Sequence, residues 1–165
     1  MKDLSVLAAR VGRRLKASRQ FLVTAESCTG GWVAQAVTAI AGSSDWFERG
    51  FVTYSNDAKR ELLAVSETTL KKNGAVSEHT AREMARGALA HSKGTVALSI
   101  TGVAGPGGGS REKPVGTVCF AWAKGRALRS ETRRFMGNRQ SVRRRSVVHA
   151  LKGVIALLEQ KSGQG

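Results

Sequence analysis

Short apolar runs alternate with helical patterns along this chain, and the alternation restricts its fold more than any other feature. Apolar runs predict strands at residues 21–25, 51–54, 95–100, 115–123 and 128–135. Helices are expected over residues 3–17 and 32–41, from Asn56 through Leu63, and after Ser66, Ser77 and Asn138. Strands separated by helices predict an α/β layered domain with a mostly parallel sheet.

Polar residues and one glycine mark the expected helix ends. Asn56, Ser66, Ser77 and Asn138 each stand where a side chain can accept the first free N–H groups of a helix. Gly42 follows the apolar segment 32–41, and we expect it to end that helix in a left-handed conformation. These residues define the boundaries of the predicted elements.

The length and composition are those of one globular domain. The chain has 165 residues, of which 41% are hydrophobic and 24% charged. We expect a single domain over residues 1–165, with residues 161–165 as a frayed tail. Residues 3–17 are amphipathic, unlike a secretory signal, and residues 27–44 are too polar for a membrane span.

Cysteine and histidine usage argues against a metal site or a disulfide scaffold. Cys28 and Cys119 lie far apart and form no CxxC motif. His79, His91 and His149 form no HxxxH pair. We therefore expect no structural zinc site, and a reducing cytoplasm is the default compartment. No cofactor is expected either.

Three segments rich in small or polar residues follow predicted strands. They are the turn around Ser27, the stretch Tyr54–Lys59, and the loop 101–110. Ligands of open α/β sheets bind beyond the carboxyl ends of the strands. The convergence of these segments at one edge predicts a binding site there.

Ser27 stands between a predicted strand and a predicted helix. Free N–H groups at a helix start attract an anion or an oxyanion, and a serine there becomes a nucleophile when a base takes its proton. Lys59 is the available base if burial or nearby positive charge lowers its pKa, and Tyr54 could relay the proton. The simpler interpretation is an N-cap serine, a tyrosine at the rim of the core and a solvated lysine.

The loop 101–110 contains five glycines. It matches neither the GxxxxGK[ST] phosphate loop nor the GxGxxG dinucleotide fingerprint. Its glycines would let the backbone approach a ligand and turn N–H groups toward an anion. The alternative is a mobile surface loop.

Positive charge gathers near the end of the chain. The net charge is +15, and eight arginines fall between Arg126 and Arg145. Arg139 and Arg143 share a helix face if a helix begins near Asn138, which suits a phosphate, whereas Arg144 and Arg145 would point elsewhere, to solvent. A basic nucleic-acid-binding module is the rival interpretation. Aromatic residues make up only 5% of the chain, which argues against it because single-stranded nucleic acid needs stacking platforms.

Several longer motifs occur in a recognisable order. They are Thr24–Gly31 (TAESCTGG), Phe51–Lys59 (FVTYSNDAK), Gly74–Ser77 (GAVS), Thr101–Pro106 (TGVAGP), Lys113–Val118 (KPVGTV) and Gly137–Arg143 (GNRQSVR). Together they resemble the CinA C-terminal-domain family, the nicotinamide-nucleotide amidohydrolases, from about Leu4 to Leu158. The family typically has Gly-Asp-Arg where this chain has Gly137-Asn138-Arg139.

The resemblance implies a three-layer α/β/α fold with a mixed sheet of about five strands. It also implies metal-free hydrolysis of the carboxamide of nicotinamide mononucleotide, a step of pyridine-nucleotide salvage, with Ser27, Tyr54 and Lys59 as catalytic residues. The expected substrate-binding residues are Cys28, Thr29, Gly30, Asn56, Thr101, Gly102, Gly105, Arg139 and Arg143. We further expect a homo-oligomer, a dimer or higher. A catalytically silent binding protein of the same family is the alternative.

Overall fold

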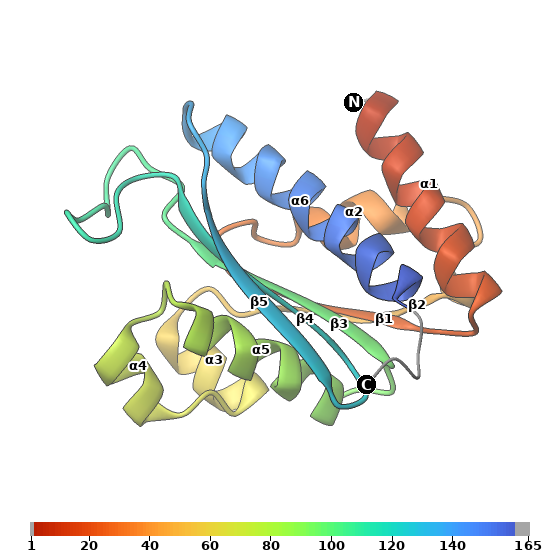
Figure 1. Cartoon of the computed structure of the whole chain (residues 1–165), viewed down its shortest axis with the longest axis horizontal. Helices are drawn as coiled ribbons and strands as arrows, with labels where there is room; N and C mark the ends of the chain where they lie inside the picture. Colours follow the sequence, from red (N-terminus) through yellow and green to blue (C-terminus); the bar gives the residue numbers. More distant parts are fainter. Residues whose placement is uncertain (1, 161–165) are drawn as a thin grey trace.

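A five-stranded sheet lies between two layers of helices in the computed structural model, which describes residues 2–160 (Figure 1). The strands are β1 (Leu22–Glu26), β2 (Phe47–Val52), β3 (Val96–Gly102), β4 (Thr117–Lys124) and β5 (Ala127–Arg134). Their order in the sheet is β2-β1-β3-β4-β5. β1 pairs in parallel with β2 and β3, whereas β4 pairs antiparallel with β3 and β5. Only β4 therefore runs against the others, and the expected mixed, mostly parallel sheet is confirmed.

The helices divide between the two faces of the sheet (Figure 1). One face is covered by α1 (Lys2–Ala17), α2 (Trp32–Thr38) and α6 (Arg139–Glu159). The other is covered by α3 (Asn56–Leu63), α4 (Glu67–Asn73) and α5 (Glu78–Ala90). Successive side chains of β1 point to opposite faces of the sheet, so Leu22 packs in the core on the first face and Val23 in the core on the second. The three-layer α/β/α arrangement expected from the motifs is confirmed.

The long helix α6 packs closely on β4. The indole N–H of Trp122 donates to the carbonyl of Ala150 at 2.9 Å. A Cβ atom at Gly153 would come within 2.1 Å of the Trp122 ring, so only glycine allows this approach. The packing holds the second half of α6 directly against β4.

Three of the four predicted caps are confirmed: Ser66, Ser77 and Asn138 each accept a backbone N–H of their helix. The predicted cap at Asn56 is wrong, because Ser55 holds the extended cap conformation and accepts the N–H of Ala58. The predicted stop at Gly42 is also wrong. α2 ends at Thr38, and Gly42 instead precedes a short 3-10 helix, η1 (Ser43–Asp45).

The second strand differs most from its predicted range. We expected residues 51–54, and β2 spans Phe47–Val52. β2 is an edge strand with exposed positions, so it accommodates Glu48 and Arg49, which hide the strand pattern in the sequence. Tyr54 consequently lies beyond the strand, in the connection to α3. The expected frayed tail, residues 161–165, lies outside the described residues.

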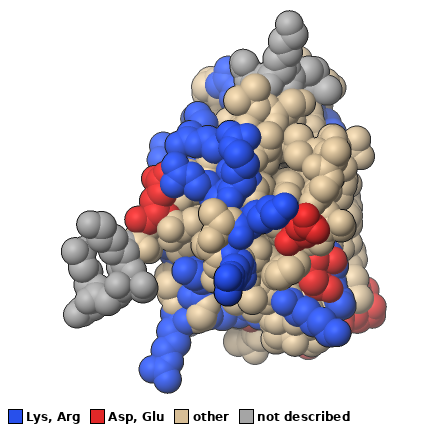
Figure 2. All heavy atoms as spheres, turned by 90° about the vertical axis from the view of Figure 1, so that its right-hand side faces the viewer, with Lys and Arg blue, Asp and Glu red and all other residues tan. Residues whose placement is uncertain are grey.

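Basic side chains spread over the end of the molecule that Figure 2 shows. They form separate patches there, with acidic side chains between them. Surface ion pairs of the molecule include Lys16 with Asp45 and Arg14 with Glu159. The visible face therefore carries a dispersed positive charge rather than one continuous basic groove.

Candidate active site

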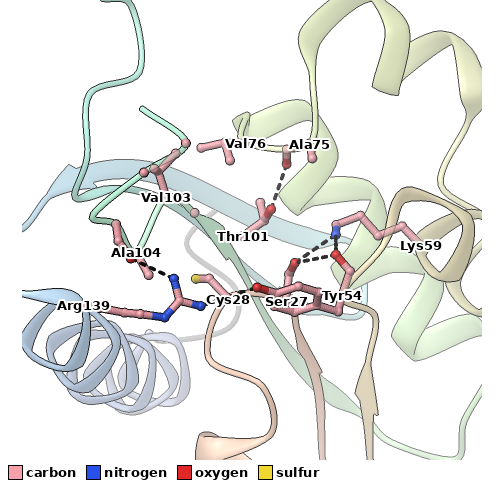
Figure 3. A pocket seen from close by; sticks show the side chains of 14 residues that line it. Ser27, Cys28, Tyr54, Lys59, Ala75, Val76, Thr101, Val103, Ala104 and Arg139 are labelled. Atoms are coloured by element: carbon pink, nitrogen blue, oxygen red, sulfur yellow. Dashed lines mark hydrogen bonds between the residues drawn. The ribbon is translucent and has the colours of Figure 1, made fainter. Parts of the chain in front are cut away.

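A pocket of about 310 Å³ lies where the carboxyl ends of β1 and β3 meet the β2–α3 connection. Its walls come from all three segments singled out in the sequence, together with the start of α6 (Figure 3). The lining residues are Ser27, Cys28, Tyr54, Lys59, Ala75, Val76, Thr101, Gly102, Val103, Ala104, Gly105, Gly107, Gly108 and Arg139.

Ser27 and Lys59 point toward one another at the floor of the pocket (Figure 3). The Lys59 Nζ atom donates to Ser27 Oγ at 2.9 Å. It also donates to the backbone carbonyls of Thr53, at 2.9 Å, and Tyr54, at 3.2 Å. Lys59 is 1% exposed and Ser27 7% exposed. The structure thus rules out the solvated lysine of the simpler interpretation.

Burial favours the neutral form of Lys59, which is the form that can accept a proton. It lowers the pKa of Lys59 from 10.5 to about 8, while the neighbouring Cys28 thiol acts weakly in the opposite direction. Of the two causes considered from the sequence, burial and nearby positive charge, burial is the one that lowers this pKa. Lys59 is therefore about half neutral near pH 8, well below the pH at which an ordinary lysine loses its proton.

Cys28 lines the pocket next to Ser27 but is a poor rival nucleophile. Burial raises the pKa of the Cys28 thiol to about 12. The reactive form of cysteine is the thiolate, which is scarce at neutral pH with such a pKa. Of the two side chains, Ser27 is the one with a base beside it.

Tyr54 contributes different atoms to the site than we expected. Its side chain is 64% exposed, and its hydroxyl accepts a long hydrogen bond from Arg139 Nη2 at 3.4 Å. The backbone carbonyl of Tyr54, not the phenol, contacts Lys59. Lys59 reaches Ser27 directly, so this geometry requires no proton relay through Tyr54.

Ser27 lies in a turn well before α2, and it is not the N-cap of that helix. The cap is Gly31, with φ 101° and no side-chain hydrogen bond. The N–H groups of Val33 and Ala34 instead donate to the carboxylate of Glu26, at 2.8 and 3.1 Å. The expectation that the first N–H groups of this helix are free for a substrate anion is therefore wrong.

The two arginines that share a face of α6 have different surroundings. Arg139 donates to the carbonyl of Gly105 at 2.8 Å and lines the pocket. Arg143 donates to the carbonyls of Cys28, at 3.0 Å, and Thr29, at 3.2 Å, and its guanidinium lies over the ring of Trp32. Arg143 therefore holds the backbone behind the pocket, and only Arg139 faces the space inside.

The pocket contains most of the expected site residues: Ser27, Cys28, Tyr54, Lys59, Thr101, Gly102, Gly105 and Arg139. It does not contain Thr29, Gly30, Asn56 or Arg143. Thr29 is buried and donates to Glu26 at 2.7 Å, while Asn56 is exposed on α3.

Six lining residues were not named individually as site residues: an apolar wall of Ala75, Val76, Val103 and Ala104, and the glycines Gly107 and Gly108. Of these, Ala75 and Val76 lie outside the three segments singled out in the sequence. The hydroxyl of Thr101 donates to the carbonyl of Ala75 at 2.8 Å, which ties the α4–α5 connection to β3. The motif Gly74–Ser77 was the available sequence signal for this wall.

Among the side chains that the structure describes, those of residues 4–160, no three His, Cys, Asp or Glu side chains lie together in a way that could hold a metal ion. No helix in that part of the chain is both long and apolar enough to cross a membrane. Both cysteines are free and buried.

The fold and this pocket agree with the comparison to known families. The CinA C-terminal domain matches residues 4–158, and the chain belongs to this family. The family expected from the motifs is thus confirmed.

Relatives of similar length carry a functional name. A protein of Escherichia coli K12 named nicotinamide-nucleotide amidohydrolase PncC is 55% identical over 91% of this chain and 92% of its own length. A protein of the same name from Pseudomonas putida is 48% identical over 95% of this chain and 98% of its own. The crystal structure of the competence/damage inducible protein CihA from Agrobacterium tumefaciens superposes with a TM-score of 0.92, at 46% identity and 96% coverage of both chains.

Proposed function

We propose that this chain is a nicotinamide-nucleotide amidohydrolase. Its reaction converts the carboxamide of nicotinamide mononucleotide and water into nicotinate mononucleotide and ammonia, within pyridine-nucleotide salvage. The names of relatives at 48–55% identity support the substrate class. The observation that carries the chemistry is the 2.9 Å hydrogen bond between Ser27 and the buried Lys59.

Lys59 acts as the general base for Ser27 in this proposal. When Lys59 is neutral, its two N–H bonds are held by the carbonyls of Thr53 and Tyr54, and its lone pair is left for the Ser27 hydroxyl. Ser27 Oγ attacks the carboxamide carbon as its proton passes to Nζ. The carbonyl π bond opens, and the oxygen of the tetrahedral intermediate becomes negative.

Backbone N–H groups next to Ser27 are suited to hold that oxygen. Cys28 follows the nucleophile and lines the pocket. In residues 2–160, the N–H groups of Cys28 and Thr29 donate to no other residue. We assign the oxyanion to this turn because preorganised N–H donors stabilise charge that develops in the transition state.

The protonated Lys59 then completes the first half of the reaction. It gives its proton to the leaving nitrogen, the C–N bond breaks, and ammonia departs from an acyl-serine ester. A water molecule enters, Lys59 takes one of its protons, and the resulting hydroxide attacks the ester carbon. Ser27 leaves with the proton from Lys59, which restores neutral Lys59, and the carboxylic acid that forms loses its own proton to solvent to give the carboxylate.

The remaining walls fit the rest of the substrate. The apolar wall of Ala75, Val76, Val103 and Ala104 suits the pyridine ring. Arg139 and the backbone around Gly105 and Gly107 suit the 5′-phosphate, since guanidinium and glycine-rich backbone both bind phosphate oxygens. Tyr54 stands at the rim, with its hydroxyl beside Arg139, where it can contact the nucleotide.

An ammonia-release assay with nicotinamide mononucleotide tests the proposal directly. Wild-type protein is expected to release ammonia and form nicotinate mononucleotide, and Ser27→Ala is expected to be inactive while folded. Salt-dependent binding of duplex DNA without ammonia release would favour the nucleic-acid interpretation instead. Folded protein with neither property would favour a catalytically silent family member.

We also propose the cytoplasm as the compartment, because both cysteines are free. As a separate proposal, the chain assembles as a homo-oligomer. Sedimentation of the purified chain tests the assembly state. A monomer at micromolar concentration would contradict it.

A further inference from the structure

Glu26 is a buried carboxylate that the proposed reaction does not use. It ends β1, directly before Ser27, and it is fully buried. It does not line the pocket. An isolated charge in such a place is strongly unfavourable, so its partners indicate why it is there.

Those partners are the turn that follows Ser27 and the start of α2. Glu26 Oε1 accepts from the hydroxyl of Thr29 at 2.7 Å and from the N–H of Val33 at 2.8 Å. Oε2 accepts from the N–H of Ala34 at 3.1 Å. The carboxylate therefore reaches across residues 27–31 and serves as the cap that Gly31 does not provide.

The guanidinium of Arg143, on α6, also binds this turn. Arg143 donates from Nε to the carbonyl of Cys28 and from Nη2 to that of Thr29. The backbone of Ser27 is fixed as well, since its N–H donates to Ile100 at 2.9 Å and its carbonyl accepts from Gly30 at 3.0 Å. The backbone N–H and carbonyl of Ser27, the residue that carries the nucleophile, are thus both hydrogen-bonded.

We propose that Glu26 and Arg143 are positioning residues that clamp the turn 27–31 and keep Ser27 Oγ within hydrogen-bond distance of Lys59 Nζ, an inference that rests on the serine–lysine mechanism above. The clamp acts on the rate of attack and leaves substrate binding almost unchanged. A displacement of about 1 Å in such a pair lowers the rate by roughly a hundredfold.

The substitution Glu26→Gln removes the negative charge and one acceptor oxygen of the side chain and keeps its size and shape. Glutamine offers one oxygen and one NH₂ group, so an N–H of the substituted side chain would face the N–H of Val33 or Ala34. That conflict shifts the turn. We expect kcat to fall about tenfold to a hundredfold, with KM within threefold of wild type.

The chain offers a matched control for each half of the clamp. Glu83 accepts from the N–H of Ser66 and from Thr69 at the start of α4, and none of these residues lines the pocket, so Glu83→Gln removes a comparable cap. Arg86 donates to two backbone carbonyls, of Gly125 and Arg126, as Arg143 does. Arg86→Gln therefore matches Arg143→Gln.

The experiment measures ammonia release, the thermal midpoint and the rate at which an alkyl fluorophosphonate labels Ser27. Glu26→Gln and Arg143→Gln should lower kcat and the labelling rate together, while Glu83→Gln and Arg86→Gln lower only the thermal midpoint. Wild-type kcat and labelling in both clamp variants would overturn the proposal. So would losses of activity in the controls equal to those in the clamp variants at the same thermal midpoint.

Two further outcomes keep the test decisive. If Glu26→Gln does not fold, Arg143→Gln alone decides, because Arg143 is only partly buried and lies on a long helix. If wild-type protein labels at Ser27 but releases no ammonia from nicotinamide mononucleotide, the substrate proposal fails, and the labelling rates still decide on the clamp.

Discussion

Arg139 and Arg143 lie one helical turn apart on α6, yet they donate to different parts of the site. Arg139 reaches the carbonyl of Gly105 in the pocket wall, and Arg143 reaches the carbonyl of Cys28 behind the nucleophile. Residues four apart on a helix share a face, but the surroundings of that face change along its length. The two arginines should therefore respond differently to substitution.

Arg139→Ala is expected to raise KM for nicotinamide mononucleotide by about tenfold to a hundredfold, because a hydrogen bond to a charged group is worth about 1.5–3 kcal/mol. kcat should change little. Nicotinamide riboside, which lacks the phosphate, serves as the control substrate in steady-state assays. Equal losses on both substrates would mean that Arg139 supports the loop at Gly105 instead of binding phosphate.

The activity should depend on pH through Lys59. Only neutral Lys59 accepts the Ser27 proton, and burial lowers the pKa of Lys59 to about 8. kcat/KM should therefore rise with pH and level off above an apparent pKa near that value. A profile that is flat between pH 6 and 9 would contradict the role of Lys59 as the base.

Lys59 should also make the free energy of unfolding depend on pH. Its pKa is about 8 when folded, against an ordinary value of 10.5, so between these values the unfolded chain binds more protons. Stability attributable to Lys59 should rise with pH across that window. Chemical denaturation of wild type and Lys59→Met measures it as a difference, because other titrating groups cancel. No change in that difference between pH 8 and 10.5 would contradict the lowered pKa.

Ser27→Ala and Lys59→Ala should each lower kcat by more than about 10³-fold, and the double variant should lose little more. The two side chains act as one unit, so the second substitution removes a group that already lacks its partner. Single-turnover ammonia release and thermal unfolding are the measurements. Substantial turnover by folded Ser27→Ala would mean that water attacks the amide directly.

Tyr54→Phe tests whether the proton moves directly between Lys59 and Ser27. The Tyr54 phenol is largely exposed and its hydroxyl contacts Arg139, so its removal should change kcat less than about fivefold and act mainly on KM. A loss of kcat comparable to that of Lys59→Ala would instead place the hydroxyl in the proton path of the substrate complex.

Sequence patterns predicted the sheet and the convergence at its edge because strand and helix periodicities are local properties. The caps at Ser66 and Ser77 were predictable for the same reason. At Ser55 and Asn56, two adjacent residues both have suitable side chains, and only the backbone conformation decides between them. β2 was misplaced because an edge strand can expose charged residues.

The site was only partly predictable from residue types and spacing. Those alone favoured a solvated Lys59, and the family motifs reversed that interpretation. Its burial depends on how α3 packs against α5 and the sheet, which no local pattern encodes. The separate roles of Arg139 and Arg143, and the cap supplied by Glu26, likewise depend on where distant elements meet.

The carboxylate at the start of α2 has a consequence for the end of the reaction. Under the proposed chemistry, a neutral amide enters the site and an anion must leave it. A helix N-terminus with free N–H groups beside Ser27 would hold that anion by its partial positive charge. Glu26 already occupies that position with a charge of its own, so the start of α2 is not available to hold the carboxylate of the newly formed product.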